Sequence, residues 1–108
     1  SLVMTNKALL DSLRINSEYF KNRVEASGFK IIRGQSSITP IMIGEEAMAV
    51  RVSEGLLELG VFAPAISYPV VPKGAARLRA QPVASHSELE LDFAVQALRN
   101  VATSLGVQ

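Results

Sequence analysis

Glycine and proline residues divide the 108-residue sequence into short segments, each about as long as one helix or one strand. The first segment, residues 7–27, has apolar residues at helical spacing and is followed by Gly28, a residue that helices favour just past their carboxyl end. Residues 29–34 are short, β-branched and bounded by glycines, which predicts a strand. The apolar stripe of the predicted helix consists of Leu9, Leu10, Leu13, Phe20 and Val24.

The next two segments predict a second strand and a second helix. Residues 38–44 read as a strand, and Pro40 within it favours an edge position or a bulge near the strand's start, because proline has no amide hydrogen for the ladder. Residues 45–59 read as a helix that begins with Glu45 and Glu46, where carboxylates interact well with the helix dipole. We expect its inward stripe to be Met48, Val52, Leu56 and Leu59.

The second half of the chain predicts two strands joined by a loop, followed by a third helix. The strands are residues 61–67 and 75–83. The helix covers residues 88–105, and Ser87 with Glu90 has the spacing of a capping box at its start. We expect its apolar side to contain Leu89, Phe93, Leu98, Val101 and Leu105.

The predicted order of elements is α-β-β-α-β-β-α. Consecutive strand pairs joined by short connections favour antiparallel pairing, so the class is α+β, a single antiparallel sheet of three to four strands with helices packed on one face. A length of 108 residues is about that of one domain, and no repeat or linker divides it. We expect residues 1–108 to form a single domain.

Composition excludes several kinds of site and partner. The sequence has no cysteine and only one histidine, His86, so neither a thiolate metal site nor a histidine triad is expected, and we expect no metal. A formal net charge of +1 gives no electrostatic case for nucleic acid or a membrane surface. No apolar run approaches the ~20 residues of a membrane span, and the first ten residues lack the pattern of a secretory signal.

Two arginines stand out in the predicted strand 75–83. Alternate side chains of an extended chain point to the same face, so Arg77 and Arg79 share one face and Leu78 takes the other. A solvated strand arginine is the ordinary reading of each residue by itself. Two of them directly after a proline-bounded loop indicate an anion site.

Five short motifs occur in order along the chain: GF-x-I, PIMIGE, L-x-E-x-GVF, YPVVPKGAARLRAQ and ASH. Together they resemble the C-terminal domain of the α-oxoamine synthases, which are pyridoxal-phosphate enzymes that condense an amino acid with an acyl-CoA. The resemblance covers almost the whole chain. Its most specific part, residues 68–79, looks closest to glycine C-acetyltransferase (2-amino-3-ketobutyrate CoA ligase), and 8-amino-7-oxononanoate synthase and serine palmitoyltransferase are the alternatives.

The resemblance implies that this chain is the small C-terminal domain of a larger transferase. In the family, the lysine that binds the cofactor covalently belongs to the preceding large domain, and none of the four lysines of this chain has that sequence context: Lys7, Lys21, Lys30 and Lys73. We therefore expect the full-length enzyme, but not this chain, to bind pyridoxal 5'-phosphate, and the chain alone to be inactive. The complete enzyme is expected to be a cytoplasmic homodimer that uses glycine and an acyl-CoA.

The resemblance also assigns roles to the residues around the two arginines. Arg79 matches the arginine that holds the substrate's α-carboxylate, a task that suits the planar, bidentate guanidinium. Arg77 is expected to be structural and to pair with a carboxylate of the missing domain. The active-site lid of the family matches Ser67, Tyr68, Pro69, Val70, Val71, Pro72, Lys73 and Gly74.

Other residues have simpler interpretations. His86 precedes a capped helix, which favours a local packing or hydrogen-bonding role. Met42 and Met48 are expected to fill the core, and Glu45 with Glu46 to start a helix. Tyr68 has two open readings, lining the substrate pocket or anchoring the lid. For the chain as a whole, the alternative of another class is a free-standing α+β ligand-binding or regulatory module.

Overall fold

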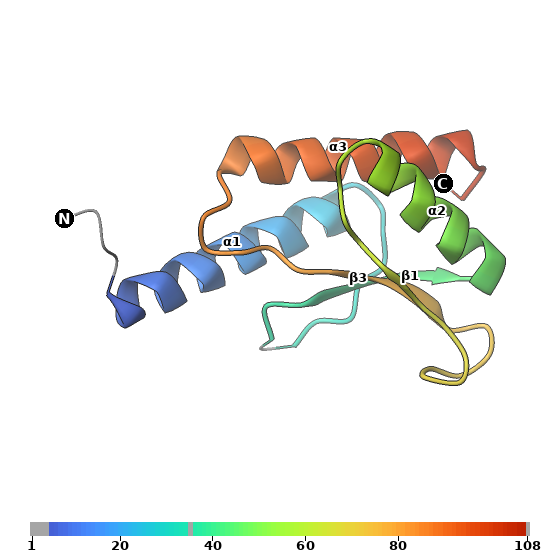
Figure 1. Ribbon diagram of the computed structural model, residues 1–108, viewed down its shortest axis with the longest axis horizontal. Helices are drawn as coiled ribbons and strands as arrows, with labels where there is room; N and C mark the ends of the chain where they lie inside the picture. The colour runs from blue at the N-terminus through green and yellow to red at the C-terminus, as the bar shows by residue number, and fades with distance from the viewer. Residues whose placement is uncertain (1–4, 35, 108) are drawn as a thin grey trace.

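The computed structural model describes residues 5–34 and 36–107, which form three helices and one antiparallel sheet (Figure 1). The strands lie in the order β1-β3-β2, and both neighbouring pairs are antiparallel. The predicted α+β class with a single antiparallel sheet is therefore confirmed. Along the chain the elements are α1 (Asn6–Ala26), β1 (Thr39–Gly44), α2 (Glu46–Glu58), β2 (Ala65–Ile66), β3 (Ala76–Ala80) and α3 (Glu88–Ser104).

The helix ends follow from local sequence. At the start of α1, the side chain of Thr5 accepts a hydrogen bond of 3.1 Å from the Ala8 amide. Past its end, Gly28 has a φ of 94°, a left-handed conformation that favours glycine. At the start of α3, the Glu90 amide donates to Ser87 Oγ at 3.1 Å, and the Ser87 amide donates to Glu90 Oε1 at 2.9 Å. The predicted capping box is confirmed.

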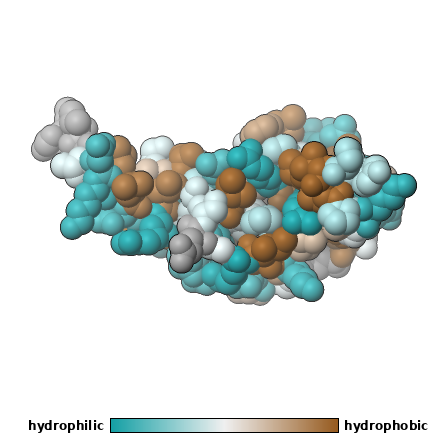
Figure 2. All heavy atoms as spheres, turned by 90° about the horizontal axis from the view of Figure 1, so that it is seen from below, coloured by the Kyte–Doolittle hydropathy of each residue, from teal (hydrophilic) through white to brown (hydrophobic). Residues whose placement is uncertain are grey.

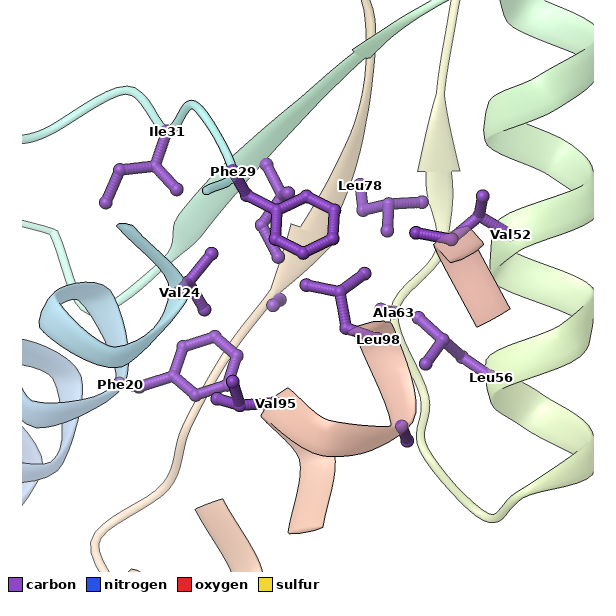
Figure 3. Close-up of a cluster of buried hydrophobic side chains, with 14 of the residues drawn as sticks. Phe20, Val24, Phe29, Ile31, Val52, Leu56, Ala63, Leu78, Val95 and Leu98 are labelled. Atoms are coloured by element: carbon purple, nitrogen blue, oxygen red, sulfur yellow. The ribbon is translucent and has the colours of Figure 1, made fainter. Parts of the chain in front are cut away.

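The core lies between the helices and one face of the sheet. In β3, Ala76, Leu78 and Ala80 are buried, whereas Arg77 and Arg79 lie on the opposite face. Figure 3 shows side chains from all three helices in one cluster with Phe29 and Leu78, so the helices pack on one face of the sheet as predicted. The residues labelled there are Phe20 and Val24 of α1, Val52 and Leu56 of α2, Val95 and Leu98 of α3, and Phe29, Ile31, Ala63 and Leu78.

The prediction of a strand at residues 29–34 is wrong, because no regular strand forms there. The segment forms one isolated bridge, Ile31 with Ile41, flanked by two hydrogen bonds to β1 of 3.1 and 2.8 Å. Beyond it the chain turns back to α1, where Arg33 forms ion pairs with Glu18 and Glu25 at 2.8 and 2.6 Å. The order of elements is thus α-β-α-β-β-α, with three strands.

The other predicted strands exist but are shorter than expected. The segment 61–67 contributes only β2, directly after Pro64, and the segment 75–83 contributes β3, which ends before Pro82. Proline cannot donate to the ladder, which accounts for both limits. β1 is an edge strand of the sheet, as Pro40 indicates, but the irregularity in its register lies between Met42 and Gly44, near its end.

The predicted inward stripes are partly wrong. In α2, Leu59 is exposed and caps the helix instead of packing inside. In α3, Leu89 is 82% exposed and Phe93 is 56% exposed. Two apolar stripes run along α3 at helical spacing, and sequence spacing does not decide which of them faces the core. The stripe that does consists of Leu91, Val95, Leu98 and Ala102, joined by Ala97.

Candidate functional site

The open face of the sheet carries both arginines of β3. Arg77 lies between Met42 of β1 and Ile66 of β2 in the strand register, and Arg79 lies opposite Pro40. Since Leu78 between them is fully buried on the helix side, the prediction that the arginines share a face is confirmed. Two guanidinium groups therefore project from one surface, away from the core.

The two arginines differ in exposure and in bonding. The side chain of Arg79 is exposed and lies within ion-pair distance of no carboxylate in the described part of the chain, and its backbone amide donates to Pro64 O at 2.9 Å. Arg77 is half-buried, and its Nε donates to Ala75 O at 3.1 Å. No described carboxylate pairs with Arg77 either, so its expected partner stays a prediction. Arg79 thus offers a whole guanidinium fork to an anion.

The segment predicted to be a lid, residues 67–74, connects β2 to β3 and is folded by its own hydrogen bonds; it is called the lid below in that predicted sense. The carbonyl of Ser67 accepts from the amides of Val70 and Val71 at 3.0 and 3.3 Å. Near the other end, Pro72 O accepts from the Ala75 amide at 3.0 Å. The turn closes at Gly74, whose φ of 80° favours glycine.

Tyr68 and Lys73 face each other across this segment. The ammonium nitrogen of Lys73 lies 5.0 Å from the centre of the Tyr68 ring, within the range of a cation–π contact. This contact favours the loop-anchoring reading of Tyr68 over the pocket-lining one. Tyr68 is 54% exposed and Val70 is 79% exposed, while Val71 is half-buried. Figure 2 views the molecule from the side on which the segment lies, and apolar atoms gather there in clusters among polar ones.

The remaining sequence predictions have mixed outcomes. His86 has the expected local role, since its Nδ1 accepts from the Val83 amide at 2.9 Å and its carbonyl accepts from Asn16 at 2.9 Å. Met48 packs against the core as predicted. Met42 does not, because its position in the register places it beside Arg77 on the open face. Glu45 and Glu46 stand at the start of α2 as expected.

An apolar hollow of about 560 Å³ lies on the helix side of the sheet, away from the arginines. Its wall includes Ile41 and Ala80 from the buried face of the strands, and its rim includes the exposed Phe62, Leu89 and Phe93. The sequence pattern did not predict this hollow, because Leu89 and Phe93 were expected on the inward side of α3. The lining of the hollow is mostly apolar, with Gln81, His86 and Glu90 as its polar members, and neither Arg77 nor Arg79 belongs to it.

The residues that the structure describes contain neither a cluster of metal ligands nor a membrane-spanning helix. Nowhere in residues 5–34 and 36–107 do three His, Asp or Glu side chains come together as metal ligands. Over the same residues, none of the three helices has both the length and the apolar character that a membrane span requires.

Comparison with known proteins identifies the family. The sequence pattern described as "Aminotransferase class I and II" matches residues 3–98. The 8-amino-7-oxononanoate synthase of Coprothermobacter proteolyticus is 43% identical over 106 residues, which are 98% of this chain and 27% of that protein. The human mitochondrial 2-amino-3-ketobutyrate coenzyme A ligase is 38% identical over 100 residues, which are 93% of this chain and 24% of that protein.

A solved structure of similar fold points to the same family as these sequence relatives. The serine palmitoyltransferase of Sphingomonas wittichii superposes with a TM-score of 0.85 at 25% identity, over 93% of this chain and 26% of that one. The chain thus spans about a quarter of the length of the relatives it matches. It belongs to the class I and II aminotransferase family and, within it, to the pyridoxal-phosphate-dependent α-oxoamine synthases.

Proposed function

We propose that this chain is the substrate-clamping C-terminal domain of a pyridoxal-phosphate-dependent acyl-CoA:amino acid C-acyltransferase. The observation that carries the proposal is Arg79, an exposed guanidinium on the open sheet face with no carboxylate partner in the described part of the chain. A bidentate guanidinium fixes both the position and the plane of a carboxylate. Arg79 would hold the amino acid's α-carboxylate in this way, and residues 67–74 would cover it.

The cofactor itself would be held by the part of the enzyme that lies outside this chain. Pyridoxal phosphate supplies an electron sink for a carbanion when it is bound, and it needs a lysine amine for its attachment. Two of the four described lysines already interact with other groups. Lys21 donates to Gly34 O and Ser36 O at 3.1 and 2.7 Å, Lys73 lies over Tyr68, and Lys7 and Lys30 are exposed. This supports the expectation that the chain alone is inactive.

Two members of the family are candidates for the complete enzyme, and different observations favour each. The sequence of residues 68–79 resembles glycine C-acetyltransferase, which would make glycine and acetyl-CoA the substrates. The identity of 43% over nearly the whole chain favours 8-amino-7-oxononanoate synthase. We propose glycine C-acetyltransferase because the motif that distinguishes the two borders the proposed clamp, and 8-amino-7-oxononanoate synthase is the second candidate.

The test is an assay of the complete enzyme, obtained by extending the reading frame upstream of Ser1 to the length of the relatives. Release of free CoA thiol is followed with glycine and acetyl-CoA, and then with other amino acids and longer acyl-CoA thioesters. Glycine-dependent release from acetyl-CoA supports the first candidate, and release only from a longer acyl-CoA supports the second. A reading frame that does not continue upstream, with no release from any thioester, would favour a free-standing ligand-binding module.

A further inference from the structure

The side chain of Arg77 forms a hydrogen bond at the junction between the lid and β3. Arg77 Nε donates to the carbonyl of Ala75, the residue that separates Gly74 from the first residue of β3. The amide of the same residue donates to Pro72 O at 3.0 Å. Ala75 is therefore held on both sides, by the turn of the lid through its amide and by Arg77 through its carbonyl.

The end of β1 lies against the same junction. Gly44 ends the strand beyond the register shift at Met42, has a φ of 101° and pairs with Ala76. A side-chain carbon placed on Gly44 would lie 3.7 Å from Gly74 O, which shows how near the two chain segments come. The junction thus joins two places in the sequence, the end of β1 and the continuous stretch from the end of the lid to the start of β3.

The aliphatic part of Arg77 is also flanked on both sides. Its cross-strand neighbours are Met42 and Ile66, and all three residues are half-buried. Apolar neighbours on both sides restrict the stem of a long side chain, which keeps Nε near the Ala75 carbonyl. Arg79 lies opposite Pro40 but is exposed, and no hydrogen bond or ion pair joins its side chain to a described residue.

We infer that Arg77 is a positioning residue that fixes the carboxyl-terminal end of the lid, and with it the path of residues 67–74 beside Arg79. This inference rests on the proposed function in treating residues 67–74 as a lid over a bound carboxylate. The hydrogen bond of Arg77 and the neighbours of its stem belong to the folded chain whether or not it binds a substrate. Physical tests on the 108-residue chain therefore separate this inference from the proposed reaction.

The first test uses an endoproteinase that cleaves only after lysine. Lys7→Arg and Lys30→Arg, introduced in every chain compared, first remove the two other exposed cleavage sites. Cleavage after Lys73 then requires the end of the lid to open, whereas cleavage after the buried Lys21 of α1 reports unfolding of that helix. Arg77→Met keeps an apolar stem and removes the donor. Loss of one hydrogen bond should raise the rate of cleavage after Lys73, relative to that after Lys21, by about two- to tenfold.

The matched control is Arg79→Met, the same substitution two residues along the same face. It should leave the ratio of the two cleavage rates unchanged. An unchanged ratio in the Arg77 variant, an equal rise in the Arg79 variant, or equally fast cleavage after Lys21 and Lys73 would each overturn the inference.

The second test needs no variant, so it does not depend on whether Arg77→Met folds. In the chain labelled with ¹⁵N, the Nε–H of Arg77 should exchange with solvent several-fold more slowly than the Nε–H of Arg79, because only the former is bonded to a carbonyl. Equal exchange rates would remove the bond on which the inference rests.

Discussion

Arg77 and Arg79 occupy equivalent places in the sequence pattern and different surroundings in the fold. Strand alternation alone predicts that they share a face, and they do. Strand alternation does not predict that Arg77 donates a hydrogen bond to Ala75 O while the side chain of Arg79 has no described partner. That difference depends on the path of the lid and on the neighbouring residues of β1 and β2. Residue type and spacing predict which side chains share the open face of the sheet. Which of the two arginines is hydrogen-bonded depends on the tertiary structure.

Tyr19 provides a test of a contact between α1 and α3 that the sequence did not indicate. Its hydroxyl donates to Asp92 Oδ1 at 2.7 Å. This hydrogen bond is the main cause that raises the pKa of Tyr19 above its ordinary value of 10.0, while nearby Arg23 acts in the opposite direction. The neutral phenol is thus favoured in the folded state. Its contribution to stability is present below pH 10 and is lost as the pH rises through the raised pKa.

Absorbance at 295 nm measures this pKa directly, since the chain has two tyrosines and Tyr68→Phe leaves only Tyr19. We expect Tyr19 to ionise above pH 10, and Asp92→Asn to lower its pKa. A Tyr19 that titrates like free tyrosine would contradict the contact.

At the scale of the elements, sequence patterns predict the helices better than the strands. Both ends of α3 are encoded locally, by the capping box at Ser87 and by the chain turning at Leu105 and Gly106. The strands are paired with residues far away in the sequence, so their length depends on partners that local sequence does not reveal. The segment 29–34 has the composition of a strand, but Arg33 is held against α1 and pairing with β1 stops after one bridge.

The capping box gives a stability prediction. Ser87→Ala removes the acceptor for the Glu90 amide and should lower the free energy of unfolding by about 1 kcal/mol. For a chain of this size that corresponds to a fall in Tm of roughly 4–8 °C. Thermal unfolding followed by circular dichroism measures it. Ser85→Ala, two residues earlier in the turn, is the matched control and should change Tm little, and equal effects of the two variants would contradict the cap.

The capping box formed by Ser87 and Glu90 also predicts that the stability of the fold depends on pH. Hydrogen bonds from the backbone and side chain of Ser87 lower the pKa of Glu90 below its ordinary value of 4.5. The carboxylate is therefore favoured in the folded state, and its contribution is present above pH 4.5 and is lost as the pH falls through the lowered pKa. Unfolding in urea between pH 3 and pH 6 should show a smaller fall in stability for Glu90→Gln than for the unaltered chain. Identical pH profiles would argue against this role of Glu90.

At the scale of the whole molecule, many large apolar side chains of the described residues are exposed. Exposed apolar side chains occur at the start of α1, around the hollow beside α3 and in the lid. The sequence pattern placed Leu9, Leu10, Leu89 and Phe93 in the inward stripes of their helices, whereas all four are exposed. Since relatives are about four times as long, we propose that further parts of the complete enzyme cover these surfaces.

If these surfaces are uncovered in the isolated chain, it should self-associate. Sedimentation equilibrium over a hundredfold range of concentration should show a weight-average mass that rises above 11.6 kDa. Leu89→Lys places a charge on the most exposed of these side chains and should reduce the association. A clean monomer at the highest concentration would remove the support for a missing interface.

We propose that Arg79 holds the carboxylate of the amino acid, and calorimetric titration of the complete, cofactor-loaded enzyme with glycine tests this role most directly. Arg79→Ala should weaken glycine binding by about 2–5 kcal/mol, or at least roughly 30-fold, while the cofactor stays bound. Arg79→Lys should restore little, because an ammonium lacks the planar fork. Arg77→Ala should lower thermal stability more than glycine affinity. Unchanged glycine affinity in the Arg79→Ala enzyme would contradict the claim, and a selective loss in the Arg77→Ala enzyme would assign the clamp to Arg77 instead.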